Sequence, residues 1–177
     1  MKKSSKKRYR RRTQLKYSQK ITFVLLAVFF VTAFFIWWHI NKIEEAVAVK
    51  VIDGDTIVLD NGETVRYLGV DTPEVSVPVT PVECFGPEAT ERNKWLVDGK
   101  RVKLVRDLKN KDKYGRLLRY VYVDEQFINL ELVRDGYARV LTVYPNVSHS
   151  REFAVVERQA EDSQHGLWSQ EKCAGRK

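Results

Sequence analysis

The chain has 177 residues, 44% of them hydrophobic, and a formal net charge of +8 at pH 7. Ten of its 31 basic residues lie in residues 1–40, which contain no acidic residue, so residues 41–177 hold 21 basic against 23 acidic side chains. This distribution excludes a protein that coats nucleic acid through a broad positive surface. The remainder, about 135 residues, is enough for one hydrophobic core and small for two.

Residues 21–40, with the sequence ITFVLLAVFFVTAFFIWWHI, contain no Lys, Arg, Asp or Glu. A helix of that length spans about 30 Å, close to the hydrocarbon thickness of a bilayer, and Trp37 and Trp38 suit its interface. We predict a basic tail over residues 1–20 and a transmembrane helix over residues 21–40. The charge before the span predicts a cytoplasmic N-terminus and an extracytoplasmic domain over residues 41–177.

A cleaved signal peptide is the alternative to this anchor. Ala46-Val47-Ala48 has the small-x-small form that signal peptidases accept, and cleavage there would secrete the domain. The apolar run is longer than a usual signal-peptide core, and a cut after Ala48 would remove the start of the first expected strand. A single-pass membrane protein is therefore favoured, with secretion left open.

The first half of the domain alternates apolar and polar residues as strands do. Three strands are predicted, and their apolar residues are Val47, Val49 and Val51 on one face, then Ile57 and Leu59, then Val65 and Tyr67. Asn61-Gly62 predicts a two-residue hairpin, because both residues tolerate positive φ, and Asp53-Gly54 makes the preceding turn. We expect an antiparallel meander.

Residues 75–85 contain two prolines without a clear period, which predicts a loop. A helix follows over residues 88–97, with Pro87 in its first turn and Gly99 after its end. Strands are predicted over residues 101–106 and 117–123, and helices over residues 129–135 and 150–164. The predicted order is β-β-β-α-β-β-α-α.

Three short polar stretches stand out, namely Asp53-Gly54-Asp55-Thr56, Arg66 followed by Asp71-Thr72-Pro73-Glu74, and Asp112-Lys113-Tyr114-Gly115-Arg116. They supply carboxylates for a hard metal, a further carboxylate for a base, and two guanidinium groups. Hydrolysis of a phosphodiester needs these groups, because water must be activated and the charge on the phosphoryl oxygens neutralised.

The chain resembles the staphylococcal nuclease, or thermonuclease, family over about residues 46–170. The resemblance rests on the order and spacing of DGDT, RYLGVDTPE, FGPEA, DKYGRLLRYVYVD, LVRDGYARV and the closing GLW. It implies an α+β fold, a five-stranded OB-fold β-barrel with three helices, which agrees with the strand and helix order predicted from the residues. The predicted transmembrane helix would precede this domain.

Carboxylates are the ligands that Ca²⁺ prefers, and the chain offers few nitrogen or sulfur donors. By similarity to the family, Asp55 and Asp71 would bind Ca²⁺ through their carboxylates and Thr72 through its backbone carbonyl. The alternative is that the aspartates only form turns, the common role of Asp beside Gly or Pro, and for Asp53 a turn or supporting role is favoured.

The resemblance makes Glu74 the general base and Arg66 and Arg116 the groups that contact the scissile phosphate. A guanidinium fork matches phosphate oxygens bidentately. From the residues alone, a Glu after Pro is more often a solvated residue near a helix start, and most arginines are exposed strand residues or partners of surface acids.

Three further residues are candidates for substrate binding. Lys113 and Tyr114 could hold a terminal phosphate, and Tyr144 could stack on a base. The family often has a second aromatic residue where this chain has Thr142, so base stacking is expected to be weaker or different.

Cys84 and Cys173 are the only cysteines, and an even pair on an extracytoplasmic domain suggests a disulfide. Such a bond would close a loop of about 90 residues and contribute on the order of 4 kcal/mol in the chain-entropy model. Two free thiols are the alternative. No spacing typical of a zinc site is present.

These observations predict a membrane-anchored, Ca²⁺-dependent nuclease that hydrolyses DNA and RNA with little sequence preference and leaves 3′-phosphorylated products. The polarity of cleavage is implied by the resemblance alone. We expect a monomer without a protein partner. The rival prediction is a non-catalytic, membrane-tethered OB-fold module that binds nucleic acid. A tail that binds anionic lipid is compatible with either.

Overall fold

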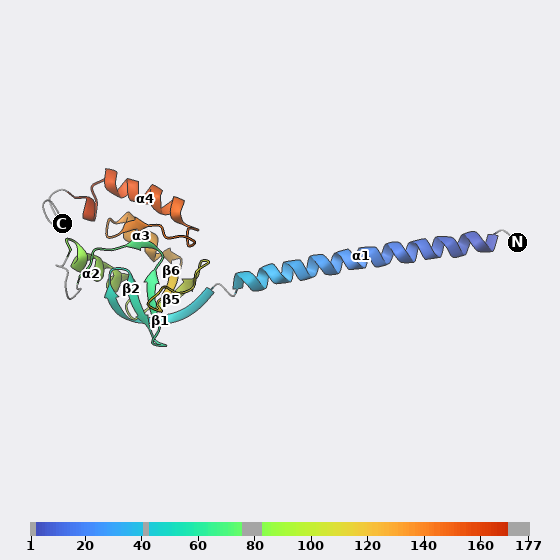
Figure 1. Cartoon of the computed structure of the whole chain (residues 1–177), viewed down its shortest axis with the longest axis horizontal. Helices are drawn as coiled ribbons and strands as arrows, with labels where there is room; N and C mark the ends of the chain where they lie inside the picture. The colour runs from blue at the N-terminus through green and yellow to red at the C-terminus, as the bar shows by residue number, and fades with distance from the viewer. Residues whose placement is uncertain (1–2, 41–42, 76–82, 170–177) are drawn as a thin grey trace. The chain divides into compact units, whose positions relative to one another are not determined.

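The computed structural model describes residues 3–40, 43–75 and 83–169 (Figure 1). The chain divides into two compact units, Met1–Asn41 and Lys42–Lys177, and each is described by itself. Residues 76–82, which make up most of the loop predicted over residues 75–85, lie outside the described residues, as does Cys173.

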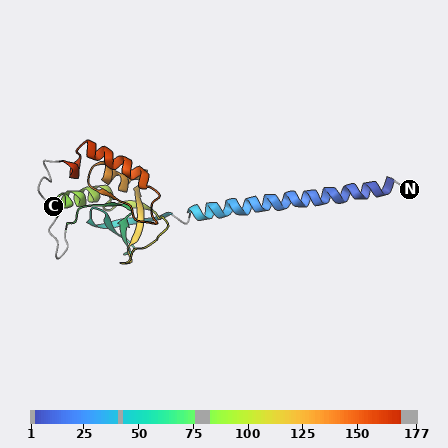
Figure 2. The ribbon, with the colours of Figure 1, turned by 45° about the horizontal axis from the view of Figure 1, so that its top comes forward.

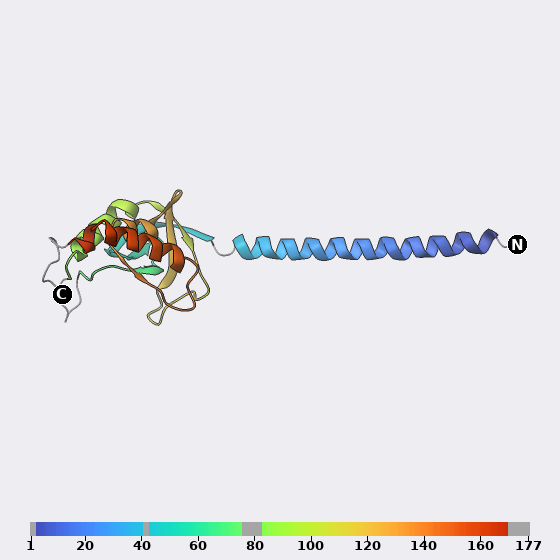
Figure 3. The same ribbon diagram turned by 90° about the horizontal axis from the view of Figure 1, so that it is seen from above.

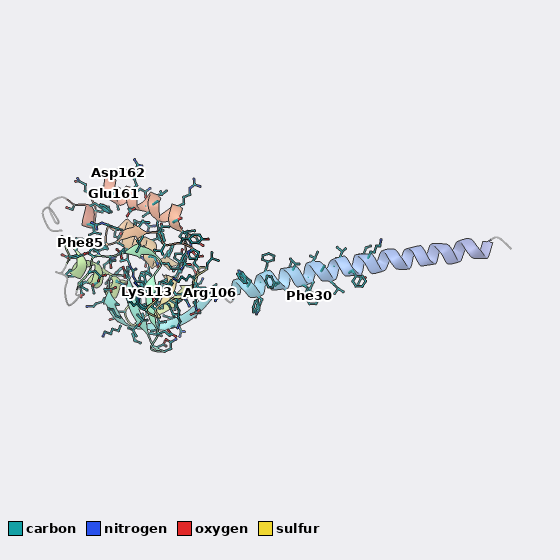
Figure 4. The ribbon with its side chains drawn as sticks, viewed as in Figure 1. Phe30, Phe85, Arg106, Lys113, Glu161 and Asp162 are labelled. Carbon is teal, nitrogen blue, oxygen red and sulfur yellow. The ribbon has the colours of Figure 1, made fainter. Side chains whose placement is uncertain are left out.

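The first unit consists of one helix, α1, Lys3–Ile40. Within it, Lys20–Trp38 has a mean hydropathy of 2.4 and is long and apolar enough to cross a membrane. Its apolar side chains project outward from the helix, as Figure 4 shows for Phe30, which is 67% exposed. The same properties fit a signal sequence, so the helix is consistent with both alternatives that the sequence left open.

The second unit is built on five strands that close into a barrel (Figure 1). They are β1 (Ile43–Asp53), β2 (Thr56–Leu59), β3 (Thr64–Tyr67), β5 (Arg101–Val105) and β6 (Leu117–Val123). Neighbouring strands pair antiparallel in the order β3-β2-β1-β5-β6, and a parallel pairing of β3 with β6 closes the barrel. The predicted five-stranded barrel and its first antiparallel meander are confirmed.

The face predicted for the first strand is wrong in part. Val49 is 52% exposed, whereas Ala48 is fully buried and Val51 is 8% exposed. The pairing of β1 with β2 shifts register between Ala48 and Lys50 and again between Val51 and Asp53. A bulge adds one residue to one strand and exchanges the faces beyond it, so strict alternation cannot hold along β1.

The hairpin between β2 and β3 also differs from the prediction. The N–H of Leu59 donates to the carbonyl of Glu63, and the N–H of Gly62 donates back to Leu59, which leaves a loop of three residues. Gly62 alone in this loop has a positive φ, of 83°. A tight turn followed by a glycine in the left-handed region is the usual three-residue hairpin, and it replaces the predicted two-residue turn.

Three short strands were not predicted. β4 (Gly69–Asp71) pairs antiparallel with β8 (Arg139–Leu141), and β7 (Gln126–Phe127) adds to β6. Two or three residues show no measurable period, so only the tertiary pairing defines them. The β4–β8 pair matters most, because it brings Asp71 beside the chain that leads to Tyr144.

The helices of the domain are α2 (Gly86–Val97), α3 (Ile128–Arg134) and α4 (Ser150–Asp162), close to the predicted ranges, followed by a 3₁₀ turn η1 (Gly166–Trp168) that was not predicted. Helix α3 lies between the barrel and α4 (Figures 1 and 2). Seen from above, α4 crosses in front of the domain (Figure 3) and buries Phe153, Val156 and Ala160, whereas Glu161 and Asp162 at its end face solvent (Figure 4). Helices α3 and α4 thus lie over the same side of the barrel (Figures 1 and 2).

Candidate active site

The site begins at the turn between β1 and β2. The carboxylate of Asp53 accepts a hydrogen bond from the N–H of Asp55 at 3.0 Å, which is the turn-forming contact expected of Asp beside Gly. Gly54 is required here, since a Cβ at this position would lie 2.6 Å from Oγ1 of Thr72. From α2, the side-chain amide of Asn93 donates to the carbonyl of Asp53 at 3.0 Å. The turn is therefore fixed from both sides.

This turn places the carboxylate of Asp55 inside the domain, where the residue is only 4% exposed. Oδ2 accepts hydrogen bonds from the N–H and the hydroxyl of Thr72, at 2.8 and 3.0 Å, and Oδ1 accepts one from the hydroxyl of Thr56 at 3.1 Å. Burial raises the pKa of Asp55 to about 7, opposed by Arg66 and by the bonds from Thr72 and reinforced by Asp53. The contacts with Arg66 and Thr72 therefore offset only part of the effect of burial on this pKa.

Arg66 connects the acidic residues from the middle of β3. Its Nη1 lies 3.0 Å from Oδ2 of Asp55, and its Nη2 lies 2.6 Å from Oδ1 of Asp71. Nη1 also donates to the carbonyls of Tyr67 and Val70, at 3.1 and 2.8 Å. With a side chain 14% exposed and held by two carboxylates, the guanidinium has a fixed plane and a fixed position.

Glu74 lies beyond Asp71 and Thr72 on the same chain segment, with an exposed side chain. Partial burial raises the pKa of its carboxyl, and the charges of Asp53 and Asp71 raise it further, against a smaller lowering by Arg66. Within the described residues, this carboxylate makes no hydrogen bond or ion pair. A raised pKa and a free carboxylate are properties of a general base.

The group carries more negative than positive charge. Besides burial, the charge of Asp53 raises the pKa of Asp55, and the charges of Asp53 and Asp71 raise that of Glu74. The positive charge of Arg66 lowers both pKa values. Among the described residues, no three His, Cys, Asp or Glu side chains converge closely enough to bind a metal by themselves. Two carboxylates and a carbonyl are nevertheless hard oxygen donors, so the residues fit a hard divalent cation that would offset this charge.

The second half of the site is the turn before β6. The carboxylate of Asp112 accepts hydrogen bonds from the N–H groups of Tyr114 and Arg116, at 2.9 and 3.0 Å, and pairs with Nε of Arg116 at 2.7 Å. Burial alone would raise the pKa of Asp112, but these bonds and the charge of Arg116 hold it below its ordinary value. Asp112 therefore aims Arg116. Sequence reasoning did not give Asp112 this role, although the spacing of Asp and Arg four residues apart was visible.

A pocket joins the two halves. Its lining includes Arg66 and Arg116, the β3–β4 connection, and Tyr144, which is 86% exposed. Lys109 and Asn146, which sequence reasoning missed, also line it and bond each other through backbone and side chain, at 2.7 and 3.1 Å. Two guanidinium groups and an exposed aromatic ring can bind a phosphate and a base together.

Other predicted residues lie beside this pocket rather than in its lining. Lys113 and Tyr114 sit in the turn that carries Arg116, with Nζ of Lys113 4.9 Å from the centroid of the Tyr114 ring. The acidic group contacts the pocket through Arg66, whose guanidinium belongs to both. The structure thus places both arginines and Tyr144 around one pocket, and the carboxylates of Asp55 and Asp71 pair with Arg66.

Cys84 lies just before α2 and takes part in a disulfide bond. Cys173 is outside the described residues, so its pairing with Cys84 stays a prediction. The bonded state of Cys84 disfavours the alternative of two free thiols.

Comparisons with known proteins agree with this geometry. A family model described as "Staphylococcal nuclease homologue" matches residues 64–170. "Endonuclease YncB" of Bacillus subtilis (strain 168) is 42% identical over 134 residues, which cover 73% of this chain and 64% of that protein. "Thermonuclease" of Staphylococcus hyicus is 36% identical over 68% of this chain and 73% of its own. "Thermonuclease" of Staphylococcus intermedius is 38% identical over 71% of this chain and 76% of its own.

Proposed function

The chain belongs to the staphylococcal nuclease family, and we propose that it is a nuclease that hydrolyses DNA and RNA with little sequence preference. The names of its relatives, endonuclease and thermonuclease, support hydrolysis of phosphodiester bonds. The observation that carries the proposal is Arg66, which pairs with two carboxylates on one side and lines the pocket with Arg116 on the other.

In the proposed reaction, water attacks phosphorus and the bond from phosphorus to the 5′ oxygen breaks, which leaves a 3′ phosphate. Glu74 takes the proton from water, and the raised pKa of its carboxyl suits this task. Arg66 and Arg116 offset the charge that builds on the phosphoryl oxygens, each held in place by its carboxylate partners. The departing oxygen takes its proton from solvent.

Asp55 and Asp71 would hold Ca²⁺ through their carboxylates and Thr72 through its carbonyl, with the surplus of negative charge as the support for a cation at this position. When bound, the cation supplies positive charge to the phosphate and orients water. Lys113 and Tyr114 bind a terminal phosphate, and Tyr144 stacks on a base beside the pocket.

Helix α1 anchors the enzyme in a membrane, with the basic tail in the cytoplasm and the nuclease domain outside. The pairing of β1 with β5 supports retention of the anchor over cleavage after Ala48. This pairing runs from Ile43 opposite Val105 to Val47 opposite Arg101, so cleavage there would remove all of it. The buried Arg119 would also lose the carboxylate of Glu44, which lies 2.9 Å from its Nη2.

Hydrolysis of single-stranded DNA by the full chain in detergent, with Ca²⁺ or with a chelator, tests this proposal. Glu74→Gln keeps the size of the side chain and removes the base, and Glu88→Gln on α2 is the matched control. We expect calcium-dependent cleavage that is retained in the control and lost in Glu74→Gln. A native chain that binds DNA and leaves it intact in Ca²⁺ would instead be the membrane-tethered binding module.

A further inference from the structure

Glu83 holds the backbone of Glu74 through two reciprocal hydrogen bonds. The N–H of Glu74 donates to Oε2 of Glu83 at 3.2 Å, and the N–H of Glu83 donates to the carbonyl oxygen of Glu74 at 2.9 Å. These bonds join residues nine positions apart. The carboxylate of Glu83 thus contacts the backbone of the proposed base, and Glu83 is not among the residues that line the pocket.

The start of α2 encloses the same peptide from another side. A Cβ at Gly86 would lie 2.7 Å from the carbonyl oxygen of Glu74 and 3.1 Å from that of Pro73, so only glycine permits this approach. The N–H of Gly86 donates to the carbonyl of Glu83 at 3.1 Å. Pro73 fixes the backbone φ just before Glu74. The backbone of Glu74 is therefore held by Pro73, Glu83 and Gly86.

The carboxylate of Glu74 depends on this support for its direction. It makes no hydrogen bond or ion pair within the described residues, unlike Arg66 and Arg116, which are aimed by Asp55, Asp71 and Asp112. A base whose carboxylate has no partner among the described residues depends on its backbone and its local packing for its direction. The two bonds to Glu83 restrain that backbone directly.

We propose that Glu83 is a positioning residue that aims Glu74, and that the disulfide at Cys84 keeps Glu83 in place. Cys84 follows Glu83 directly and is disulfide-bonded, so a covalent link acts next to the residue that contacts the base. The inference rests on the proposed function, because it assumes that Glu74 is the base. It assigns to Glu83 a role in the rate of the chemical step, with no role in binding the substrate.

The test compares Glu83→Ala with Glu83→Gln in the full chain, using single-stranded DNA and Ca²⁺. Gln retains an oxygen that accepts from the N–H of Glu74, whereas Ala removes it. We expect kcat to fall about 10-fold in Glu83→Ala with KM unchanged. A base in the wrong position stabilises the transition state less, whereas substrate binding does not depend on it. Glu83→Gln should stay within about 2-fold of the native kcat.

Two controls separate positioning from general damage. Glu88→Ala removes a nearby charge on α2 and should leave kcat and KM unchanged. The Tm of each variant reports stability, and assays well below the lowest Tm keep every variant folded. Native kcat in Glu83→Ala, or an equal loss in Glu83→Gln, would overturn the proposal.

The double variant Glu74→Gln with Glu83→Ala links the effect to the base. If Glu83 acts through Glu74, removing Glu83 costs nothing further once the base is gone, so the double variant should match Glu74→Gln. An additional 10-fold loss would mean that Glu83 acts elsewhere. Full activity of Glu74→Gln would instead contradict the proposed function, so the two failures are distinguishable.

Reduction tests the contribution of the disulfide. A dithiol such as dithiothreitol gives two electrons and two protons to the bond, which becomes two thiols, and is itself oxidised to a disulfide. We expect the kcat of the native chain to fall about 5-fold on reduction, Glu83→Ala to fall no further, and Cys84→Ser to show the loss without reductant. A native kcat unchanged by complete reduction would overturn the role of the disulfide.

Discussion

Two carboxylates of this domain, Asp55 at the β1–β2 turn and Asp107 after β5, are similarly buried, but their pKa values are shifted in opposite directions. Asp55 is 4% exposed and Asp107 6%. Asp107 accepts hydrogen bonds from the N–H of Leu108, the hydroxyl of Tyr120 and both the N–H and hydroxyl of Ser148. Asp55 accepts three hydrogen bonds and pairs with an arginine.

The pKa values of these carboxyls nevertheless move in opposite directions. Although burial raises the pKa of Asp107, its four hydrogen bonds outweigh that effect and hold it below its ordinary value. The pKa of Asp55 rises to about 7, because it is more deeply desolvated and lies near Asp53, while its arginine is shared with Asp71. A carboxylate whose hydrogen bonds outweigh its desolvation stabilises the fold, whereas a buried carboxylate with a raised pKa is a candidate for a functional site.

The largest expected effect is that of Asp55→Asn, which should impair catalysis where the same change at Asp107 does not. We expect kcat for DNA hydrolysis to fall on the order of 1000-fold through loss of the cation's charge at the phosphate. The free energy of unfolding without metal should change by less than about 1 kcal/mol, because the amide removes the cost of burying a charge but also removes the ion pair with Arg66. Urea unfolding and single-turnover hydrolysis measure both. Asp107→Asn is the matched control, and a similar loss of kcat there would break the comparison.

Arg116 differs from Arg66 in that it pairs with one carboxylate, that of Asp112, whereas Arg66 pairs with two. Arg116→Ala should lower kcat about 100-fold, because one of the two guanidinium groups at the phosphate is lost. The free energy of unfolding should fall by less than about 1 kcal/mol, since the pair with Asp112 is partly exposed. Arg116→Lys retains the positive charge and loses the two-pronged guanidinium group. A native kcat in Arg116→Lys would therefore contradict bidentate binding of the phosphate.

Asp107→Asn should destabilise the domain without affecting the chemistry. The loss of charge-assisted hydrogen bonds is expected to cost about 2 kcal/mol at pH 7. Because the folded pKa of Asp107 lies below its ordinary 3.8, its contribution is complete above that value and is lost as pH falls through the folded pKa. The native and variant free energies of unfolding, followed from pH 7 to pH 2, should therefore converge at low pH. A constant difference would be the contradicting result.

Tyr144→Ala should have the smallest effect. The ring is 86% exposed and lines the pocket, so its removal is expected to raise KM roughly 10-fold through lost base stacking, with little change in kcat. Steady-state hydrolysis of a short single strand measures it. Thr142→Ala, two residues away, serves as the control, and equal effects of the two changes would argue against stacking.

The site could be predicted from sequence as a set of residues and only partly as an arrangement. Asp55, Asp71 and the two arginines were singled out because hydrolysis of a phosphodiester requires their charges and because the motifs that contain them resemble those of the nuclease family. That Arg66 binds both aspartates at once could not be predicted, since it depends on how β3, β4 and the β1–β2 turn meet. Glu83 was missed, because its bond to Glu74 crosses a segment without any period.

The fold shows the same division between local and tertiary information. Long periodic segments, such as β6 and α4, were placed within two residues at their ends. The bulges in β1 were invisible, because Val47, Val49 and Val51 alternate in sequence whether or not the register shifts. The pairing of β4 with β8 also arises only in the folded chain, and it positions Asp71.

Calorimetric titration of Ca²⁺ into the full chain in detergent, in the absence of nucleic acid, is the measurement that tests this account most directly. We expect one site in the native protein, no measurable binding in Asp55→Asn, and native binding in Asp107→Asn. Ca²⁺ at about 100 times its Kd should also stabilise the native domain by about 2.7 kcal/mol. Equal binding by the native chain and Asp55→Asn would contradict the claim that the surplus charge around Asp55 is a cation site.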